Sequence, residues 1–289
     1  MREVTAPLEI REWSRAERRR GRRVGFVPTM GALHEGHLRL VAHARERCDA
    51  VVLSVFVNPL QFGPGEDFAR YPRDPARDGA LAAERGVDCF FVPGTDAMFA
   101  TLPSVQVAPG PLGDVLEGAA RPGHFAGVLT VVAKLFHLVE PDVAVFGRKD
   151  FQQATLVRRL VADLSFPLEI DVVPTVRELD GLALSSRNRY LTPDARRAAL
   201  ALSRGLRAVE QGWRGGQADP RTLERRGLEV LRTPGVTPEY VALVDQDLQP
   251  VARADARTVV LVAATVGATR LIDNVVLGEG LAADIAVRG

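Results

Sequence analysis

Two hydrophobic patterns alternate through the first 175 residues. Short, nearly continuous apolar runs, typical of buried parallel strands, are followed by segments whose apolar residues recur every three or four positions, as in amphipathic helices. The predicted strands are Arg22–Thr29, Ala50–Val57, Asp88–Val92, Leu102–Val107, Asp142–Phe146 and Leu168–Val173. The predicted helices are Leu8–Arg20, Gly36–Cys48, Ala76–Arg85, Phe125–Val139 and residues 151–164. This alternation predicts a parallel sheet with helices on both faces.

The pattern changes after Thr175. The next fifteen or so residues are polar, and Asp180-Gly181 within them indicates a hairpin. Two helical segments, Pro193–Gly212 and Pro220–Leu231, then precede three strands. The three predicted strands are Tyr240–Val244, Thr258–Ala264 and Leu271–Val276. We therefore predict an α/β protein with a Rossmann-like sheet in residues 1–175 and a smaller α+β domain in residues 176–289.

Candidate chemistry is concentrated in residues 24–40, V-G-F-V-P-T-M-G-A-L-H-E-G-H-L-R-L. A strand and a glycine-containing turn lead to a helix that begins near Glu35–Gly36, with His34 and His37 around its start. The N-terminus of a helix has unpaired N–H groups and a partial positive charge, so it attracts anions. Imidazoles placed there can donate hydrogen bonds to phosphoryl oxygens. The segment therefore predicts a phosphate site.

Other common motifs fit this segment less well. Two histidines three apart could hold a metal, but H-E-G-H is not the H-E-x-x-H zinc pattern, and no further Cys/His cluster lies nearby. The glycine spacing matches neither the dinucleotide fingerprint nor the P-loop. The H-x-G-H pattern instead resembles that of the superfamily of adenylate-forming and nucleotidyl-transferring enzymes known by its HIGH motif.

Polar residues also follow other predicted strands. Asn58 and Gln61 come directly after one of them, at the edge of an open α/β sheet where ligands bind. Lys149 follows another strand, with Gln153 about one helical turn later on a similar face. Arg121 precedes a helix start. It either belongs to a second anion site or pairs with a nearby acid, and the sequence does not decide between the two.

A last candidate, Ser185-Ser186-Arg187, lies near the junction of the two halves. Hydroxyls and a guanidinium together suit phosphate. Taken alone, however, these residues fit an ordinary loop before a helix better.

Composition limits the expected partners. The net charge of +1 gives no electrostatic argument for a nucleic-acid partner. No apolar run reaches membrane-spanning length, and the charged first ten residues do not resemble a signal peptide. Cys48 and Cys89 lie in apolar segments, so we expect buried thiols and a cytoplasmic location. Only two of the 37 basic residues are lysines, Lys134 and Lys149. A position that needs a compact point charge favours lysine over arginine, so the rarity of lysine is a weak hint of such a role for these two residues.

Seven motifs, in order and over nearly the full length, resemble those of the pantothenate synthetase (pantoate–β-alanine ligase) family. They are P-T-M-G-A-L-H-E-G-H, F-V-N-P-L-Q-F, R-Y-P-R, E-G-A-A-R-P-G-H-F, F-G-R-K-D-F-Q-Q, D-G-L-A-L-S-S-R-N-R-Y-L and R-L-I-D-N. The resemblance implies an ATP- and Mg²⁺-dependent ligase. Pantoate would first form pantoyl adenylate and pyrophosphate, and β-alanine would then give pantothenate and AMP.

The resemblance also implies residue roles. His37, His34 and Lys149 are the expected catalytic residues. The expected ATP contacts are Met30, Gly31, His34, His37, Gly147, Arg148, Lys149, Asp150, Val176, Leu184, Ser185, Ser186 and Arg187. The expected contacts of pantoate and β-alanine are Gln61, Gln153, Asn58 and Arg121. The metal ligands are not identified. A homodimer is expected because the family is commonly dimeric, and the C-terminal domain is expected to act as a lid hinged around Val176.

Three departures from the family pattern stand out. The loop Met98–Val105 is shorter than usual, Arg148 replaces an acidic residue, and Val244-Asp245-Gln246-Asp247-Leu248 lacks a threonine. The weaker alternatives are a nucleotidyltransferase that leaves the nucleotide on its product, an RNA-binding protein like class I aminoacyl-tRNA synthetases, and a regulatory module that binds ATP without turnover.

Overall fold

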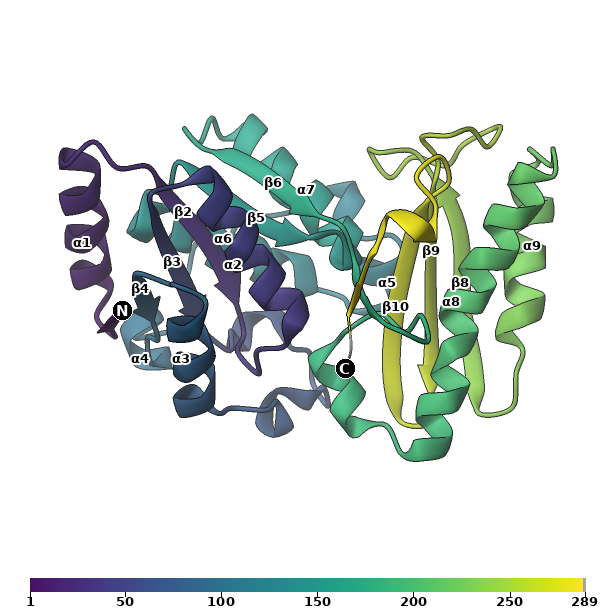
Figure 1. Cartoon of the computed structure of the whole chain (residues 1–289), viewed down its shortest axis with the longest axis horizontal. Coiled ribbons are helices and arrows are strands. Elements are labelled where there is room, and N and C mark those ends of the chain that lie inside the picture. The colour runs from purple at the N-terminus through teal and green to yellow at the C-terminus, as the bar shows by residue number, and fades with distance from the viewer. Residues whose placement is uncertain (288–289) are drawn as a thin grey trace. The chain divides into compact units, whose positions relative to one another are not determined.

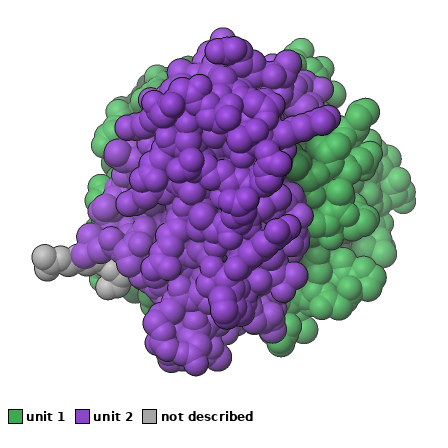
Figure 2. Space-filling view, turned by 90° about the vertical axis from the view of Figure 1, so that its right-hand side faces the viewer, with its two compact units in different colours: residues 1–147, 156–173 green, residues 148–155, 174–289 purple. Residues whose placement is uncertain are grey.

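The computed structural model describes residues 1–287, which fall into two units. Met1–Gly147 and Leu156–Val173 form unit 1, and Arg148–Thr155 and Pro174–Gly289 form unit 2 (Figure 2). The sequence pattern predicts a domain boundary after residue 175. The structural division lies close to that position but also assigns Arg148–Thr155, a segment inside the first predicted domain, to unit 2.

Six strands form one parallel sheet in unit 1, in the order β1-β4-β3-β2-β5-β6 (Figure 1). The strands are β1 (Arg2–Val4), β2 (Val24–Thr29), β3 (Ala50–Val55), β4 (Cys89–Phe91), β5 (Val143–Gly147) and β6 (Glu169–Val173). The connecting helices are α1 (Pro7–Arg19), α2 (Glu35–Arg47), α3 (Pro75–Glu84), α4 (Thr95–Met98), α5 (Glu117–Ala120), α6 (His124–Val139) and α7 (Phe151–Asp163). The order of the strands reverses between β2 and β5, and in sheets of this kind ligands bind beyond the carboxyl ends of the strands at such a point.

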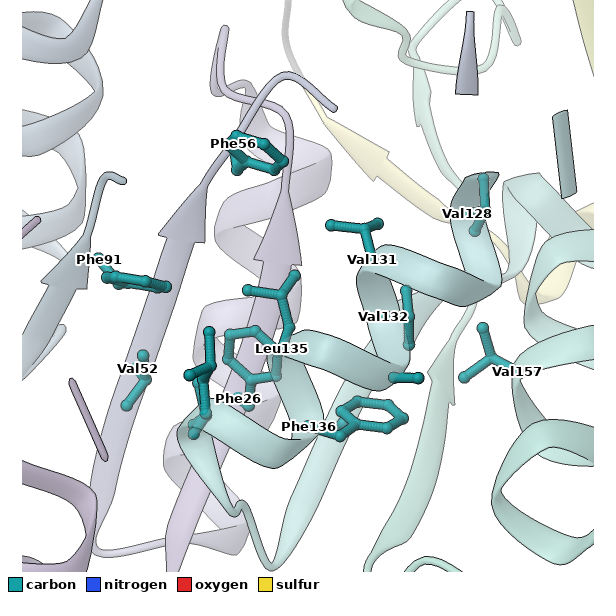
Figure 3. Close-up of a cluster of buried hydrophobic side chains, with 14 of the residues drawn as sticks. Phe26, Val52, Phe56, Phe91, Val128, Val131, Val132, Leu135, Phe136 and Val157 are labelled. Atoms are coloured by element: carbon teal, nitrogen blue, oxygen red, sulfur yellow. The ribbon is translucent and has the colours of Figure 1, made fainter. Parts of the chain in front are cut away.

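Helices cover both faces of this sheet. On the face of α6, Phe26 contacts Phe136 edge to face at a centroid distance of 6.5 Å (Figure 3). Phe146 contacts the same ring edge to face, also at 6.5 Å. On the other face α2 packs against β2. The packing is tight at Gly25, where an added Cβ atom would lie only 3.1 Å from Cβ of Cys48. The arrangement confirms the predicted α/β fold with its parallel sheet.

Unit 2 contains an antiparallel sheet, β10-β9-β8, packed against two helices. Its elements are β7 (Val176–Glu178), α8 (Pro193–Arg214), α9 (Pro220–Leu231), β8 (Val236–Val244), β9 (Val259–Val266), β10 (Thr269–Val276) and β11 (Ile285–Val287). β11 pairs in parallel with β7. Helix α8 begins as its sequence suggests, with Pro193 in the first turn and Thr192 Oγ1 accepting from the Ala195 N–H at 3.2 Å. The small α+β domain is thus confirmed.

Local predictions have mixed outcomes. The hairpin at Asp180-Gly181 is confirmed by an antiparallel bridge between Arg177 and Ala183. The predicted strand at Leu102–Val107 is wrong, since the segment forms no strand and its Leu102 and Val105 are exposed. Proline at position 103 lacks an N–H, and the Val107 N–H is donated to Thr130 Oγ1 at 3.0 Å, so the segment supplies few groups for a ladder.

The two cysteines are buried and free, as their apolar surroundings predict. Burial raises the pKa of Cys48, and it raises the pKa of Cys89 to about 12. Both thiols therefore stay protonated and chemically inert. No helix within residues 1–287 is long and apolar enough to cross a membrane.

Candidate active site

The turn after β2 begins the candidate site in unit 1. Thr29 Oγ1 donates to the Ser54 carbonyl at 2.7 Å and accepts from the Gly31 N–H at 3.2 Å. Gly31 has a φ of +85°, and a Cβ atom there would lie 2.8 Å from Val55 Cγ1. Only glycine satisfies both constraints, so Gly31 sets the course of the turn that leads to α2.

Asp78, from α3, holds the same turn from the other side. Its carboxylate accepts the N–H groups of Ala32 and Leu33, each at 2.8 Å, and its side chain is almost fully buried. Burial raises the pKa of Asp78, although the two N–H donors act in the opposite direction. Ala32 has a positive φ of 52°, a strained conformation that these bonds stabilise. The sequence analysis does not identify Asp78, because a single acid in a surface-type helix carries no motif signal.

His34 and His37 cap the N-terminus of α2 reciprocally. The Gly36 N–H donates to His34 Nδ1 at 3.1 Å, and the His34 N–H donates to His37 Nδ1 at 3.4 Å. The two rings lie side by side, with centroids 4.0 Å apart. Because a backbone N–H can only donate, both Nδ1 atoms act as acceptors, and each neutral ring carries its proton on Nε2. The backbone thus gives both imidazoles the same tautomer, with Nε2–H as the donor.

Gln61 lies beyond the carboxyl end of β3, the strand next to β2, and its amide is fixed at both ends. Oε1 accepts from Asn58 Nδ2 at 3.0 Å, while Nε2 contacts Met30 Sδ at 3.1 Å. Asn58 also donates to the Gly127 carbonyl at 3.1 Å. A Cβ atom at Gly127 would lie 2.2 Å from the Leu60 carbonyl oxygen, so glycine is required where α6 meets this segment. Thioether sulfur is a weak acceptor, so a substrate hydroxyl could replace it as the partner of Nε2.

Arg121 also contacts the Gln61 segment. Its guanidinium forms a two-pronged ion pair with Glu66, at 2.9 and 2.6 Å, and donates to the Gln61 carbonyl at 3.2 Å. His124 Nδ1 lies 2.8 Å from the same carbonyl. Burial alone would raise the pKa of Glu66, but Arg121 outweighs it and lowers that pKa. Of the two interpretations that the sequence leaves open, the structure shows the pairing with an acid, while the predicted substrate contact of Arg121 stays a prediction.

The remaining candidates belong to unit 2. Lys149 lies in a single 3₁₀ turn, Arg148–Asp150, directly after Gly147 at the end of β5. Its Nζ is 3.6 Å from Asp150 Oδ1. Gln153 follows in the first turn of α7 and is partly buried. The chain therefore changes from unit 1 to unit 2 between Gly147 and Arg148, so Lys149 and Gln153 do not belong to the sheet unit that carries the histidines.

Arg148, where the family pattern has an acidic residue, is a buried ion-pair residue. Its guanidinium pairs with Glu279 and with Asp284, the latter at 2.8 Å. The charge is therefore neutralised by carboxylates from the end of the chain. The predicted ATP contact of Arg148 stays a prediction.

Ser185 and its neighbours form the other candidate group of unit 2. Ser185 Oγ accepts from the Arg187 N–H at 3.3 Å, which starts a 3₁₀ turn over Ser186–Tyr190. Leu184, Ser185, Ser186 and Arg187 are partly buried, and Val176, on β7, is buried. No group of three or more His, Cys, Asp or Glu side chains within the described residues is arranged to hold a metal ion.

Within unit 1 the structure brings together the expected residues that follow three neighbouring strands. Asn58 and Gln61 follow β3, Met30 to His37 follow β2, and Gly147 ends β5. Strands that are parallel end at the same edge, so these residues gather at the reversal point of the sheet. Such an arrangement suits a nucleotide and an anionic substrate.

Comparisons with known proteins agree with this geometry. The chain matches the family described as Pantoate-beta-alanine ligase over residues 2–276. It is 51% identical over 273 residues to a pantothenate synthetase of Moorella thermoacetica, covering 93% of this chain and 95% of that one. A crystal structure of pantothenate synthetase from Thermus thermophilus superimposes with a TM-score of 0.91 at 50% identity, covering 96% of this chain and 99% of that one.

A more distant structure carries ligands. It is the pantoate–β-alanine ligase from Francisella tularensis, complexed with Beta-gamma ATP and β-alanine, and it is 31% identical with a TM-score of 0.81. The alignment covers 97% of this chain and 99% of that chain. The present chain belongs to the pantoate–β-alanine ligase family.

Proposed function

We propose that the protein condenses (R)-pantoate with β-alanine to pantothenate, using ATP and releasing AMP and pyrophosphate. The observation that carries this proposal is the pair of histidines at the start of α2, whose tautomers are set by the backbone so that both present Nε2–H. Two fixed donors at a helix N-terminus suit the phosphates of a nucleotide. Family membership and the ligands of the Francisella tularensis structure support the choice of substrates.

In the first step, the pantoate carboxylate attacks the α-phosphorus of ATP and pyrophosphate leaves. The carboxylate is already ionised at neutral pH, so this step needs no general base. It needs placement in line with the leaving group and donors for the negative charge on the phosphoryl oxygens. His34, His37 and Lys149 are proposed to supply that charge stabilisation, with Ser185 and Arg187 as further donors.

Gln61 and Gln153 are proposed to bind pantoate. A neutral amide both donates to and accepts from hydroxyl groups without adding charge beside the reacting carboxylate. Gln61 is pre-oriented by Asn58 at 3.0 Å, and its weak contact with Met30 sulfur is the one that pantoate would displace. Asn58 thus acts through Gln61 in this proposal.

In the second step, the amine of β-alanine attacks the acyl carbon of pantoyl adenylate and AMP leaves. The adenylate is open to hydrolysis, so water must be kept from the site. The proposed ATP contacts are divided between the two units, with His34 and His37 in unit 1 and Lys149 and Ser185 in unit 2. The lid role expected for unit 2 stays part of this proposal.

Mg²⁺ is proposed to arrive with ATP. Because the described residues offer no cluster of three or more metal-binding side chains, the triphosphate would supply most of its ligands. Bound in this way, the ion would neutralise phosphate charge. A homodimer and a cytoplasmic location also remain proposals, and we expect neither a membrane nor a nucleic-acid partner.

The test is exchange of labelled pyrophosphate into ATP. We expect exchange that requires pantoate and Mg²⁺, and AMP that accumulates with turnover only after β-alanine is added. If pantoate supports no exchange but a phosphorylated acceptor takes up the nucleotide, the protein is a nucleotidyltransferase, and the roles of Gln61 and Gln153 are wrong.

A further inference from the structure

The turn that carries Lys149 is held by a residue from the other end of unit 2. Asn274, on β10, is almost fully buried, and its Nδ2 donates to the carbonyls of both Arg148 and Lys149, each at 2.9 Å. One amide group therefore uses both of its hydrogens on two successive peptide units. This arrangement restricts the backbone from which the Lys149 side chain extends.

The orientation of the Asn274 amide shows which of its polar atoms stabilise the Lys149 turn. Asn274 Oδ1 is buried and has no hydrogen-bond partner within the described residues, while both donors are used. The reverse orientation would place the amide oxygen against two carbonyl oxygens. Unsatisfied buried acceptors are uncommon in folded proteins. The donors, and not the acceptor, account for asparagine at this position.

A chain of ion pairs braces the same turn. Asp273 binds Arg177 with two bonds of 2.6 and 2.8 Å, and Arg177 Nε donates to Asp284 at 2.6 Å. Asp284 in turn accepts from Arg148 at 2.8 Å. The Asp273 carboxylate also accepts the Asn274 N–H at 2.8 Å. The side chain of Arg148 and the backbone of Asn274 are thus connected by one buried network, which fixes both partners of the Lys149 turn.

We propose that Asn274 is a positioning residue for the adenylate-forming step, acting through Lys149. It sets the backbone of the 3₁₀ turn and hence the position from which Nζ meets a phosphoryl oxygen. This inference rests on the proposed function of Lys149. A misplacement of about 1 Å in a catalytic group can lower a rate about 100-fold. Loss of Asn274 should therefore slow the first step without removing any group that touches the substrates.

The test is a double-mutant cycle in the full-length protein, read by pantoate-dependent exchange of labelled pyrophosphate into ATP. The variants are Asn274→Asp, which keeps the shape but removes both donors, Lys149→Ala, and the two together. We expect Asn274→Asp to slow exchange by about 10- to 100-fold. In the Lys149→Ala background the same change should have little further effect, because the group that it positions is gone.

Thr258→Ala is the matched control. Thr258 is also buried in unit 2, and its hydroxyl makes two hydrogen bonds with Asp255, at 2.9 and 3.0 Å, neither of which involves the Lys149 turn. It should lower the melting temperature but leave the exchange rate of the folded protein unchanged. If Asn274→Asp does not fold, Asn274→Ser, which keeps one short donor, takes its place in the cycle.

Two results would overturn the inference, and they have different meanings. If Lys149→Ala slows exchange and Asn274→Asp slows it further by the same factor as in the parent, Asn274 does not act through Lys149. If Lys149→Ala itself exchanges normally, the proposed function of Lys149 fails, and the positioning role of Asn274 fails with it.

Discussion

The histidine pair and the lysine of the candidate site are supported in opposite ways. His34 and His37 are held by each other's backbone within three residues, on a turn whose main distant support is Asp78. Lys149 is held by Asn274, which lies 125 residues later in the chain. A group supported by its sequence neighbours appears as a motif. For a group supported by a distant strand, the neighbouring sequence gives no sign of that support.

This difference implies different sensitivities to mutation. Near the histidines, most single changes should alter the chemistry while leaving the rest of the fold intact. Around Lys149, the supporting residues also hold unit 2 together, because Arg177 and Asp284 connect β7, the C-terminal segment and β10. Stability and activity should therefore separate cleanly in unit 1 and less cleanly in unit 2.

The largest expected effect is on the stability of unit 2. Arg177→Met leaves the buried Asp273 carboxylate without its guanidinium partner and leaves Asp284 with Arg148 alone, and we expect a loss of about 3–5 kcal/mol in the free energy of unfolding. In the parent, burial alone would lower the pKa of Arg177, but the two carboxylates outweigh burial and raise it, so the charge persists. Denaturant titration measures the loss.

A surface pair in the same unit provides the control. Arg197 and Asp194 form an exposed pair at the start of α8, and Arg197→Gln should leave the midpoint of denaturation unchanged. If Arg177→Met were as stable as the parent, the buried network would not be what holds the Lys149 turn.

The next effect is on the chemistry at α2. His37→Ala removes one Nε2–H donor and one half of the reciprocal cap, and we expect pyrophosphate exchange to fall about 100- to 1000-fold. The melting temperature should change little. The control is His43→Gln on the same helix, where the ring contacts Asp171 at 2.8 Å. Equal losses of exchange in both variants would show a general effect of histidine removal from α2 and contradict the proposed role.

The smallest expected effect concerns the support of the histidine turn. Asp78→Asn weakens the acceptors for the Ala32 and Leu33 N–H groups, and we expect the free energy of unfolding to fall by about 1–3 kcal/mol. Exchange should slow only modestly, since both rings and their own capping bonds remain. The free energy of unfolding and the exchange rate are measured in the parent and the variant. Together they distinguish a role of Asp78 in supporting the turn from a role in the reaction.

The difference in stability between the parent and Asp78→Asn should depend on pH, and the direction of this dependence can be derived. Burial raises the pKa of Asp78 above its ordinary value of 3.8, so the folded state binds the proton more tightly than the unfolded state. The contribution is then fully present below the unfolded pKa and is lost as pH rises through the folded pKa. The stability advantage of the parent over Asp78→Asn should therefore shrink as pH rises from the ordinary pKa of 3.8 through the raised pKa of the folded state. An advantage that grows with pH would contradict this assignment.

Much of the fold could be predicted because its signals are local. The apolar runs at β2, β3 and β5 are long enough to define buried strands, and the turn at Asp180-Gly181 needs a glycine, with φ of +98°, that the sequence shows. The strand predicted at Leu102–Val107 was wrong because a short apolar segment forms a strand only if a neighbouring strand edge is free to pair with it. Nothing in the local sequence states whether that edge exists.

The supporting residues of the site could not be predicted in the same way. Asp78 and Asn274 look like an ordinary helix acid and an ordinary strand amide, and each contacts backbone atoms far away in sequence. The pairing of Arg121 with an acid depended on where Glu66 lies, 55 residues earlier. Backbone partners carry no sequence signature, because every residue has the same peptide group.

Neighbouring residues alone are enough to specify most of the strands and helices, the glycine turn at Gly31, and the two histidines at a helix start, because each depends on positions only a few residues apart. Packing was needed to establish which charges are neutralised by ion pairs, which acid supports the histidine turn, and which distant side chain holds the Lys149 turn. Those outcomes depend on contacts between segments separated by tens to more than a hundred residues, and such contacts exist only once the chain has folded.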